Sequence, residues 1–312
     1  MPRPTPRDLP PAPADHATPP VKGLLLMIAG VMCLPVLDTF AKLLTESVSA
    51  GEVAGIRFVV QTLLLAPLAS ALLGRRLWRP EKPLLQAMRG VLVAGATLLY
   101  FAALKEMALP DALAIFFVEP LILTALSALF LGEKVGWRRF SAVGVGLVGA
   151  LVIIGPQFQQ VGTTALLPLG TAICFAAYIA LTRQLGGRTG AVAMQFYAGV
   201  AGAVVMAVAL GLGHAAGIEA LTLSWPSGRD WGLILGLGVA ATAAHLLIVA
   251  ALKHAAASLL APFQYLEVVS ATLLGLFVFG DFPRPYVWLG MALIIGSGLF
   301  VFWRERRLAR RG

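Results

Sequence analysis

The chain has 312 residues, of which 59% are hydrophobic and only 12% are charged, and its formal net charge is +9. Apolar windows of about 20 residues recur along almost its whole length, which is typical of a helical protein that crosses a membrane many times and excludes an ordinary soluble domain. Its two cysteines, Cys33 and Cys174, both lie inside apolar stretches, so neither a disulfide framework nor a metal site is expected.

The N-terminal tail is followed by ten expected membrane-spanning helices. Eight of the first twenty residues are prolines and no apolar run occurs there, so residues 1–22 are expected to form a disordered cytoplasmic tail. A basic cytoplasmic tail is expected at residues 304–312. The predicted fold class is an all-α, polytopic membrane protein whose apolar segments are residues 23–44, 52–73, 87–105, 111–131, 138–155, 164–185, 190–211, 231–251, 256–279 and 286–303.

The basic residues predict the orientation of these helices. If the N-terminus is cytoplasmic, nineteen of the 24 Lys and Arg residues fall on the inner side, Arg89 among them, and only three fall on the outer side. The positive-inside rule then places both termini in the cytoplasm, and a bacterial-type inner membrane is the expected location. Basic loops that face anionic lipid also account for the charge of +9, so no nucleic-acid partner is expected.

Two stretches of the chain are degraded copies of each other. The sequence ALKEMALPDALAIFFVEPLILTALSALFLGE begins at Ala103, and ALKHAAASLLAPFQYLEVVSATLLGLFVFGD begins at Ala251. Without a gap, Glu119 aligns with Glu267, 148 positions later. Five helices per copy is an odd number, so the second copy must enter the membrane upside down. We therefore expect two inverted five-helix repeats, residues 23–156 and 157–303, an architecture that supports alternating access to a central site.

Two further segments reveal a family resemblance. The segments are LFLGEKVGWRRFSAVGVGLVGALVIIGP at 129–156 and FVFGDFPRPYVWLGMALIIGSGLFVFWRE at 277–305. They resemble the drug/metabolite transporter superfamily, specifically the EamA type with two five-helix repeats, and the likeness covers Gly23 to Glu305. Family members usually carry a helix-kinking proline in both copies, but here Pro120 is matched by Val268. The bend of the second copy is therefore expected nearer Pro262.

Substrate is less well defined by this resemblance. The sequences DTFAK at 38–42, GIRF around Arg57 and PFQYLE at 262–267 resemble a subgroup assigned to cofactor-like or zwitterionic metabolites such as riboflavin or S-adenosylmethionine. Exporters of aromatic or hydrophobic amino acids or of drugs share the same fold. The resemblance thus implies a transporter of a small organic metabolite and leaves its substrate and direction open.

Glu119 and Glu267 are the main candidates for a functional site. By helical rise, Glu119 lies roughly 12 Å from the outer end of its expected helix, and Glu267 lies about 16 Å from the inner end of its own. A carboxylate at such depth is costly unless it faces a partner or water. We interpret both as proton or substrate ligands; the alternative is a protonated acid that is hydrogen-bonded to nearby backbone.

Three charged residues in the first two helices predict an outer gate. Asp38 and Arg57 lie at similar expected depths, so we expect an ion pair between them that closes the outer side, acts as a gate, or both. Lys42 is four residues after Asp38 and shares its helix face, although it could instead extend to the lipid interface. Pro35, Pro120 and Pro262 are the expected hinges.

Several further polar and aromatic side chains are expected to line the cavity, through helices one, three, four, six, eight and nine. Aromatic rings there can stack on an aromatic or cationic substrate, although any single ring can equally serve only to pack the bundle. The expected lining residues are His245, Gln264, Tyr265, Tyr178, Phe116 and Tyr100.

Motifs of enzymes and ATP-driven pumps do not occur in the sequence. Neither Gly-x-Ser-x-Gly nor His-Glu-x-x-His is found, and no glycine-rich loop follows a strand, so neither an enzyme nor a bound cofactor is expected. Energy would then come from a proton gradient or from exchange. The expected protein is a secondary transporter, a monomer or homodimer, with a non-transporting scaffold or a channel as the alternatives.

Overall fold

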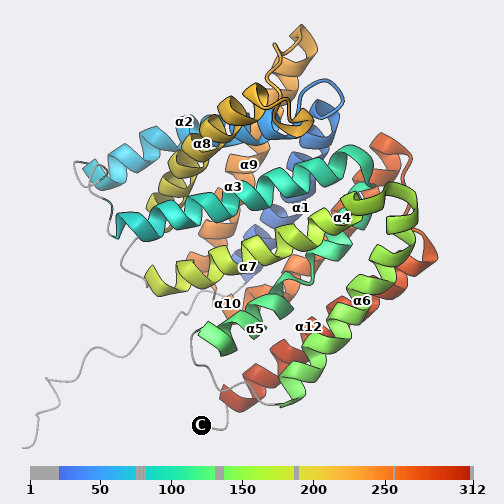
Figure 1. Cartoon of the computed structure of the whole chain (residues 1–312). Coiled ribbons are helices and arrows are strands. Elements are labelled where there is room, and N and C mark those ends of the chain that lie inside the picture. Colours follow the sequence, from blue (N-terminus) through green and yellow to red (C-terminus); the bar gives the residue numbers. More distant parts are fainter. Residues whose placement is uncertain are drawn as a thin grey trace, which may run out of the picture.

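The computed structural model describes residues 21–309 apart from 75, 76, 78, 79, 81, 131–136, 186–189 and 256. Within these ranges every regular element is helical (Figure 1), which confirms the predicted fold class. The predictions for residues 1–20, for most of the basic inner loops and for the Gly-acidic pair at Gly132 and Glu133 lie outside the described residues.

The first half of the chain begins with three long helices and ends with a broken crossing and a further helix. These are α1 (Val21–Leu44), α2 (Ala50–Leu73), α3 (Pro83–Glu106), the short α4 (Leu109–Phe116) with α5 (Glu119–Phe130), and α6 (Trp137–Val161). Each of the unbroken helices extends beyond the expected apolar segment by a few residues at one or both ends.

The second half repeats this order after a short 3₁₀ turn, η2 (Gly162–Leu166). Three long helices follow, with a second short turn between the last two: α7 (Leu167–Leu185), α8 (Ala191–Ala215), η4 (Glu219–Leu221) and α9 (Gly228–His254). A crossing made of four short pieces comes next and α12 completes the half: α10 (Ala257–Leu260), η5 (Ala261–Leu266), α11 (Glu267–Leu274), the π-helical η6 (Gly275–Phe279) and α12 (Pro285–Ala309).

Among the described residues, nine helical stretches are long and apolar enough to cross a membrane. One of these, Phe140–Thr182, runs for 43 residues through α6, η2 and α7. The backbone reverses within it at Gly162, whose φ of +58° suits a residue without a Cβ, and Figure 1 shows α6 and α7 leaving this junction in different directions. Counted as two crossings, this stretch brings the total to the ten that the sequence predicted.

Helix packing relates the two halves to each other. α1 packs along α9 and α3 packs along α7, while α2 lies against α8 and α6 against α12. In addition, α2 contacts α9 and α3 contacts α8, and α1 contacts α11 as α7 contacts α5. Exchanging α1 with α7, α2 with α8, α3 with α9, α5 with α11 and α6 with α12 leaves this set of pairs unchanged. The halves therefore occupy equivalent positions, and their helices interleave at the centre.

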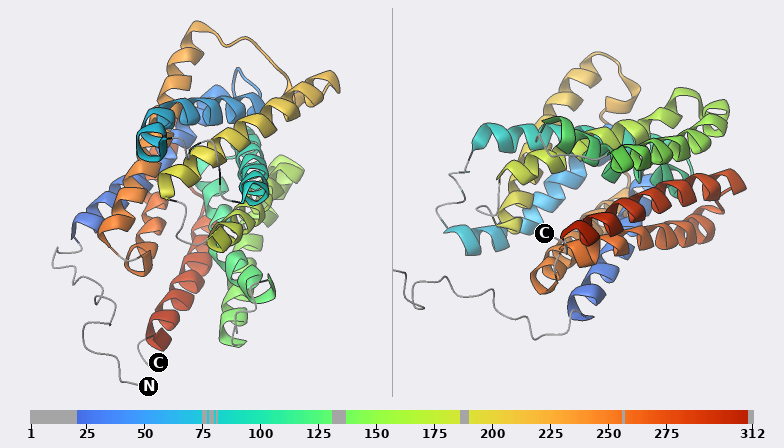
Figure 2. Two further views of the ribbon diagram at one scale, coloured as in Figure 1. Left: turned by 90° about the vertical axis from the view of Figure 1, so that its left-hand side faces the viewer. Right: turned by 90° about the horizontal axis from the view of Figure 1, so that it is seen from below.

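The views of the ribbon make the interleaving visible. In Figure 2 the blue α1 lies beside the orange α9, although the two are far apart in sequence. Figure 1 shows α6 and α12 side by side at one edge of the bundle. Their backbones approach closely, because a Cβ on Gly149 would stand 2.8 Å from the carbonyl oxygen of Gly290. Small residues allow such close helix contact inside a membrane.

Apolar side chains occur both inside the bundle and on its outer surface. Buried residues such as Phe58, Leu113 and Leu237 belong to one apolar cluster that runs through both halves. Large apolar side chains such as Leu63 and Phe277 are exposed on the outside. A surface of this kind is suited to contact with lipid chains, so the fold is that of a multi-pass membrane protein.

Candidate functional site

The two aligned glutamates occupy the same kind of position in the structure. Glu119 is the first residue of α5, after a turn at Phe117 and Val118, and Glu267 is the first residue of α11, after the 3₁₀ segment η5. Each therefore stands where a helix begins in the middle of a membrane crossing. The backbone N–H groups at these points are used within the chain: that of Glu267 bonds to Gln264, and those of Leu121 and Ile122 bond to Val118.

The interruptions before α5 and before α11 differ in the position of the proline. Pro120 is the second residue of α5, where its missing N–H is not needed for the helix. In the second copy Pro262 is the second residue of η5, several residues before Glu267. By contrast, α1 continues as one helix through Pro35, so this expected hinge does not interrupt it.

Glu267 belongs to an acidic cluster that we define as Asp38, Tyr100 and Glu267. Asp38 on α1 is a buried electrostatic neighbour of Glu267, and Tyr100 on α3 interacts with both carboxyl groups. The Tyr100 hydroxyl faces the Asp38 carboxyl, but their geometry is not that of a good hydrogen bond. The cluster thus brings together three sequence-predicted residues from both halves.

Arg57 on α2 lies beside this cluster, but its direct contact is a different one from that expected. Its Nη1 donates to the hydroxyl of Thr97 on α3 at 2.6 Å. Asp38 acts on Arg57 only electrostatically, and the predicted ion pair between them is not formed among the described residues, because the Thr97 hydroxyl takes the direct contact. His245 on α9 is a further electrostatic neighbour of Arg57.

Glu119 has a different neighbour from Glu267. It is half-buried, and its carboxyl group interacts electrostatically with the hydroxyl of Tyr265 on η5. The two glutamates are therefore aligned in sequence but occupy different environments. Gln264, which was expected to share the site with Glu267, is exposed.

Aromatic rings from both halves form a continuous aromatic chain beside these charges. The ring of Phe116 on α4 lies 6.0 Å from that of Tyr100. Most rings of this aromatic chain belong to residues that the sequence predicted as lining residues. Phe175 was missed, although it lies three residues before Tyr178 on the same helix face. The chain runs Tyr265, Phe117, Phe116, Phe175 and Tyr178, with centroid distances of 5.4, 6.3, 5.6 and 5.4 Å between successive rings.

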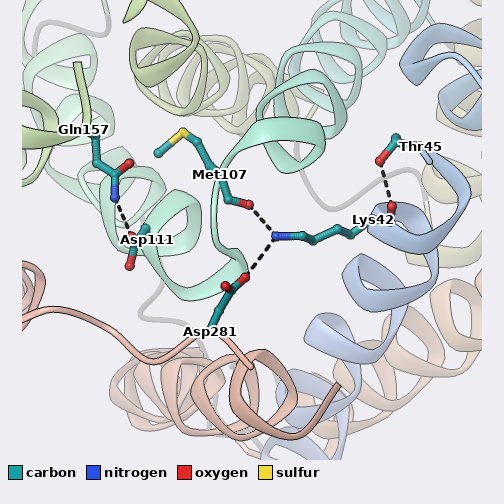
Figure 3. A network of polar contacts seen from close by, with 6 residues as sticks. All are labelled: Lys42, Thr45, Met107, Asp111, Gln157 and Asp281. Atoms are coloured by element: carbon teal, nitrogen blue, oxygen red, sulfur yellow. Dashed lines mark hydrogen bonds and ion pairs between the residues drawn. The ribbon is translucent and has the colours of Figure 1, made fainter. Parts of the chain in front are cut away.

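Lys42 has one partner in its own half of the protein and one in the other half (Figure 3). Its Nζ donates to the carbonyl oxygen of Met107 at 2.7 Å and lies 3.3 Å from a carboxylate oxygen of Asp281. The ammonium group also lies 4.8 Å from the centroid of the Phe279 ring. The predicted grouping of Lys42 with Asp38 and Arg57 therefore needs correction: the long side chain extends from the end of α1 to the segment after η6.

Asp111 interacts electrostatically with Asp281 and Lys42 and so extends this set. We define the outer network, named after the side on which the Lys and Arg distribution is expected to place it, as Lys42, Asp281, Asp111, Gln157 and Tyr286. Figure 3 shows Gln157 donating to Asp111, at 2.5 Å. Gln157 also donates to the hydroxyl of Tyr286 on α12 at 3.3 Å. Sequence reasoning missed Asp111, although an acidic residue after a proline at a helix start was a usable signal.

The loops on this side of the protein are fastened to one another as well. Glu52, in the first turn of α2, accepts hydrogen bonds from the backbone N–H and the hydroxyl of Ser224, both at 2.9 Å. Ser47 donates to Asp230 on α9 at 2.8 Å. These contacts join the α1–α2 loop of the first half to the region before α9 of the second half. Together with the Lys42–Asp281 pair they join the two halves at this end of the bundle.

Arg89 is the most prominent residue that sequence reasoning misplaced. It was counted on the inner side, as the third residue of the expected segment 87–105, but α3 begins at Pro83, so Arg89 is the seventh residue of this helix, with an exposed fraction of 1%. It donates to Thr182 at 2.8 Å, to Gln86 at 2.5 Å and to the Tyr178 hydroxyl at 3.1 Å. A buried arginine thus stands at the end of the aromatic chain.

Comparison with known proteins agrees with this architecture. The model of the EamA-like transporter family matches residues 21–155 and 162–303. A riboflavin transporter of Rhizobium johnstonii is 28% identical over 93% of this chain and 94% of that protein. An S-adenosylmethionine uptake transporter of Rickettsia felis is 25% identical over 88% of this chain and 90% of its own.

Two further matches concern export and fold. A pseudopaline exporter of Pseudomonas aeruginosa is 28% identical over 88% of this chain and 93% of its own. A solved crystal structure superposes with a TM-score of 0.62 at 22% identity, covering 90% of this chain and 96% of that one, and so shows the same fold. The matched relatives thus span nearly the full chain and share one fold.

Proposed function

Because this chain belongs to the EamA-like transporter family, we propose that it is a secondary active transporter that moves a small organic metabolite across the inner membrane by alternating access. The observation that supports this most directly is the meeting of charged residues from both halves inside the helical bundle. Asp38 and Arg57 come from the first half, and Glu267 and His245 come from the second. Motion of one half against the other would remodel such a site.

Two buried polar groups at this site could form hydrogen bonds with a bound ligand. The Nε of Arg57 and the hydroxyl of Tyr100 are buried and have no hydrogen-bond partner among the described residues. Buried polar groups in proteins are nearly always hydrogen-bonded, so unsatisfied ones call for an explanation. A polar substrate that bonds to both groups supplies one.

The substrate class follows from the combination of rings and charges. The aromatic chain offers stacking surfaces, and the acidic cluster with Arg57 offers both signs of charge. This suits amino-acid-like, zwitterionic or cofactor-like metabolites, such as the riboflavin or S-adenosylmethionine named for two relatives. Export of an aromatic or hydrophobic amino acid or a drug is the second candidate, favoured by the relative named as a pseudopaline exporter.

We propose that the energy for transport comes from a proton gradient or from the exchange of one substrate for another. Asp38 and Glu267 are buried carboxyl groups that interact with each other, which is an arrangement suited to binding and releasing a proton. Glu119 and Tyr265 provide a second polar position. We place both chain termini in the cytoplasm on the basis of the Lys and Arg distribution, so that the outer network faces the periplasm.

Flux through the purified protein in liposomes tests the proposal. Radiolabelled riboflavin, S-adenosylmethionine and aromatic amino acids would be offered with and without unlabelled substrate inside, and with an imposed proton gradient. Saturable uptake with counterflow is the expected result, against protein-free liposomes as the control. Flux that does not saturate would indicate a channel, and no flux with any of these compounds would support a scaffold.

A further inference from the structure

Arg89 is buried among neutral groups, unlike the other arginine of the interior. Arg57 has Asp38 as an electrostatic partner. The hydrogen bonds of Arg89 go to the Thr182 hydroxyl, the Gln86 side-chain oxygen and the Tyr178 hydroxyl, and its guanidinium lies 4.8 Å from the centroid of the Tyr178 ring. In the part of the chain that the structure describes, no carboxylate forms an ion pair with it.

An uncompensated buried cation is costly, so its retention requires a reason. Taking a charged group out of water costs far more than neutral hydrogen bonds return, unless an opposite charge completes the site. The ring of Tyr178 contributes only part of this balance, since the attraction of a cation to an aromatic face is much weaker than the cost of removing the cation from water. The charge balance of this site is therefore completed best by an anion.

Spare donors surround the same guanidinium. Arginine carries five N–H groups, of which three are used within the described residues, so two are left. The side-chain nitrogen of Gln86, a residue with an exposed fraction of 4%, has no hydrogen-bond partner in these ranges. Both residues lie in the first two turns of α3, where the helix end adds partial positive charge.

We propose that Arg89, Gln86 and Tyr178 form a subsite for an anionic oxygen group, a carboxylate or a phosphate, carried by the transported metabolite. In the structure described here the Tyr178 hydroxyl occupies one of the guanidinium N–H groups. The donor of this bond is already charged, and an anionic oxygen in place of the hydroxyl adds the attraction between opposite charges and can accept two parallel bonds from the guanidinium. The subsite thus exchanges a neutral acceptor for a charged one when the ligand arrives.

The position of Tyr178 connects this subsite to the rest of the binding region. Its ring is the last of the aromatic chain, 5.4 Å from Phe175, and its hydroxyl meets Arg89. A metabolite that stacks on the chain would therefore present its anionic group to Arg89. Because Arg89 lies where α3 packs along α7, the ligand gains access when these two helices of opposite halves separate. The inference rests on the proposed transport function and specifies its substrate as one with a planar ring and an anionic group.

Inorganic phosphate is the first probe, since it needs no knowledge of the substrate. Thermal unfolding of the purified full-length protein in neutral detergent would be followed against phosphate, with chloride holding the ionic strength constant. A ligand that binds the folded state raises its melting temperature by mass action, and we expect a saturable rise of roughly 3 °C. Arg89→Gln should abolish it, and Gln86→Leu should reduce it without touching the charge.

Matched variants keep this test decisive. Arg89→Lys retains the charge but not the planar fork, so a smaller rise is expected. Arg229→Gln changes an exposed arginine outside the site and should leave the rise unchanged. A rise of equal size in wild type and Arg89→Gln, or no saturable rise in any folded variant, would overturn the proposal.

A lipid headgroup is the other possible source of an anionic phosphate group at Arg89. Nanodiscs of phosphatidylglycerol and of phosphatidylcholine distinguish it: Arg89-dependent stabilisation by phosphatidylglycerol without any effect of soluble phosphate would assign the residue to lipid and contradict the proposal. Riboflavin and riboflavin 5′-phosphate form a matched pair for the substrate. We expect at least tenfold tighter binding of the phosphate ester, lost in Arg89→Gln.

These results separate the two levels of inference. If neither flavin binds but phosphate protects through Arg89, the anion subsite stands and the flavin assignment is wrong. If the liposome assay detects transport while phosphate has no effect on any variant, the transport function stands and the subsite is wrong.

Discussion

Lys42 and Asp281 join the two halves of the protein. The Nζ of Lys42 lies 3.3 Å from the Asp281 carboxylate and 2.7 Å from the Met107 carbonyl oxygen (Figure 3). The two side chains are only partly exposed, at 15% and 36%, so water screens their attraction incompletely. In the alternating-access cycle that we propose, the contact with Asp281 breaks when this side opens, so it stabilises the state in which this side is closed.

Replacing Lys42 by methionine is expected to favour the open state. The change Lys42→Met removes hydrogen bonds from a charged donor, each contributing about 1.5–3 kcal/mol, and a shift of about 1.4 kcal/mol changes an equilibrium tenfold. Ala41 is fully buried and lies three residues after Asp38 on the same helix face. In a chain lacking Cys33 and Cys174, labelling of Ala41→Cys by an impermeant maleimide should become about tenfold faster.

A second ion pair on the same side provides the control. Lys105 donates to Glu219 at 2.7 Å, but their side chains are 47% and 86% exposed, and such surface pairs contribute little. The hydrogen bond and charge of Lys105 lower the pKa of Glu219, so the pair stabilises the protein above the ordinary glutamate pKa and loses its effect as the pH falls. Lys105→Met should leave the labelling rate unchanged. An increase equal to that of Lys42→Met would contradict a specific role for Lys42.

Gly298 on α12 is required for the position of Tyr265. A Cβ at Gly298 would collide with the Tyr265 hydroxyl, so Gly298→Ala must displace this ring from its contact with Phe117. Aromatic pairs contribute about 1 kcal/mol beyond the burial of their area, so we expect roughly fivefold weaker binding of an aromatic substrate. The measurement is the KM of uptake in liposomes.

Gly296, two residues earlier on the same helix, is the matched control. Nothing lies within 4 Å of a Cβ placed there. Gly296→Ala should keep the KM of the wild type and raise stability by about 0.5–1 kcal/mol, because alanine loses less conformational freedom than glycine in a helix. Equal KM values for both alanine variants would show that Tyr265 does not take part in binding.

The helical fold could be predicted because its signals are local. Apolar length alone identified the crossings, and the aligned copies around Glu119 and Glu267 indicated the duplication that the helix packing reproduces. The exact start of a helix is less well encoded. The helix α3 begins at Pro83, four residues before the expected start, so Arg89, which was counted on the inner side, lies one turn further inside its helix and is buried in the protein interior.

The partners of the charged side chains could not be predicted in the same way. Spacing along one helix and similar depth suggested a group of Asp38, Arg57 and Lys42, because those are the only distances a single sequence provides. The actual partner of Lys42 is Asp281, 239 residues away, and that of Arg57 is Thr97 on the third helix. Contacts between halves depend on how the helices interleave, which neither periodicity nor spacing specifies.

Phe175 is expected to contribute to recognition of aromatic substrates. It links Phe116 to Tyr178 in the aromatic chain, so Phe175→Leu keeps an apolar side chain but removes two ring contacts. We expect binding of an aromatic substrate to weaken by about 1 kcal/mol, roughly fivefold, while a non-aromatic substrate is unaffected. Ligand-induced thermal shifts measure both.

A ring pair elsewhere in the bundle controls for the loss of packing. Phe196 on α8 lies 5.9 Å from Tyr197, outside the aromatic chain. Phe196→Leu should lower the stability of the protein by no more than Phe175→Leu does. It should leave ligand binding unchanged. Equal losses of affinity in the two variants would indicate a general packing effect.

The two glutamates are expected to have separable roles in transport, although they align in sequence. Glu267 lies with Asp38 in the acidic cluster, so Glu267→Gln should remove the proton site and abolish the pH dependence of uptake and accumulation against a gradient, while exchange at equal concentrations continues. Glu119 faces Tyr265 instead, so Glu119→Gln should raise the KM and keep the pH dependence. Glu106→Gln, at an exposed acid that accepts from Thr164, controls for loss of charge. Since glutamine preserves the size of each side chain, a result in which Glu119→Gln and Glu267→Gln both behave like Glu106→Gln would mean that neither carboxyl group binds proton or substrate.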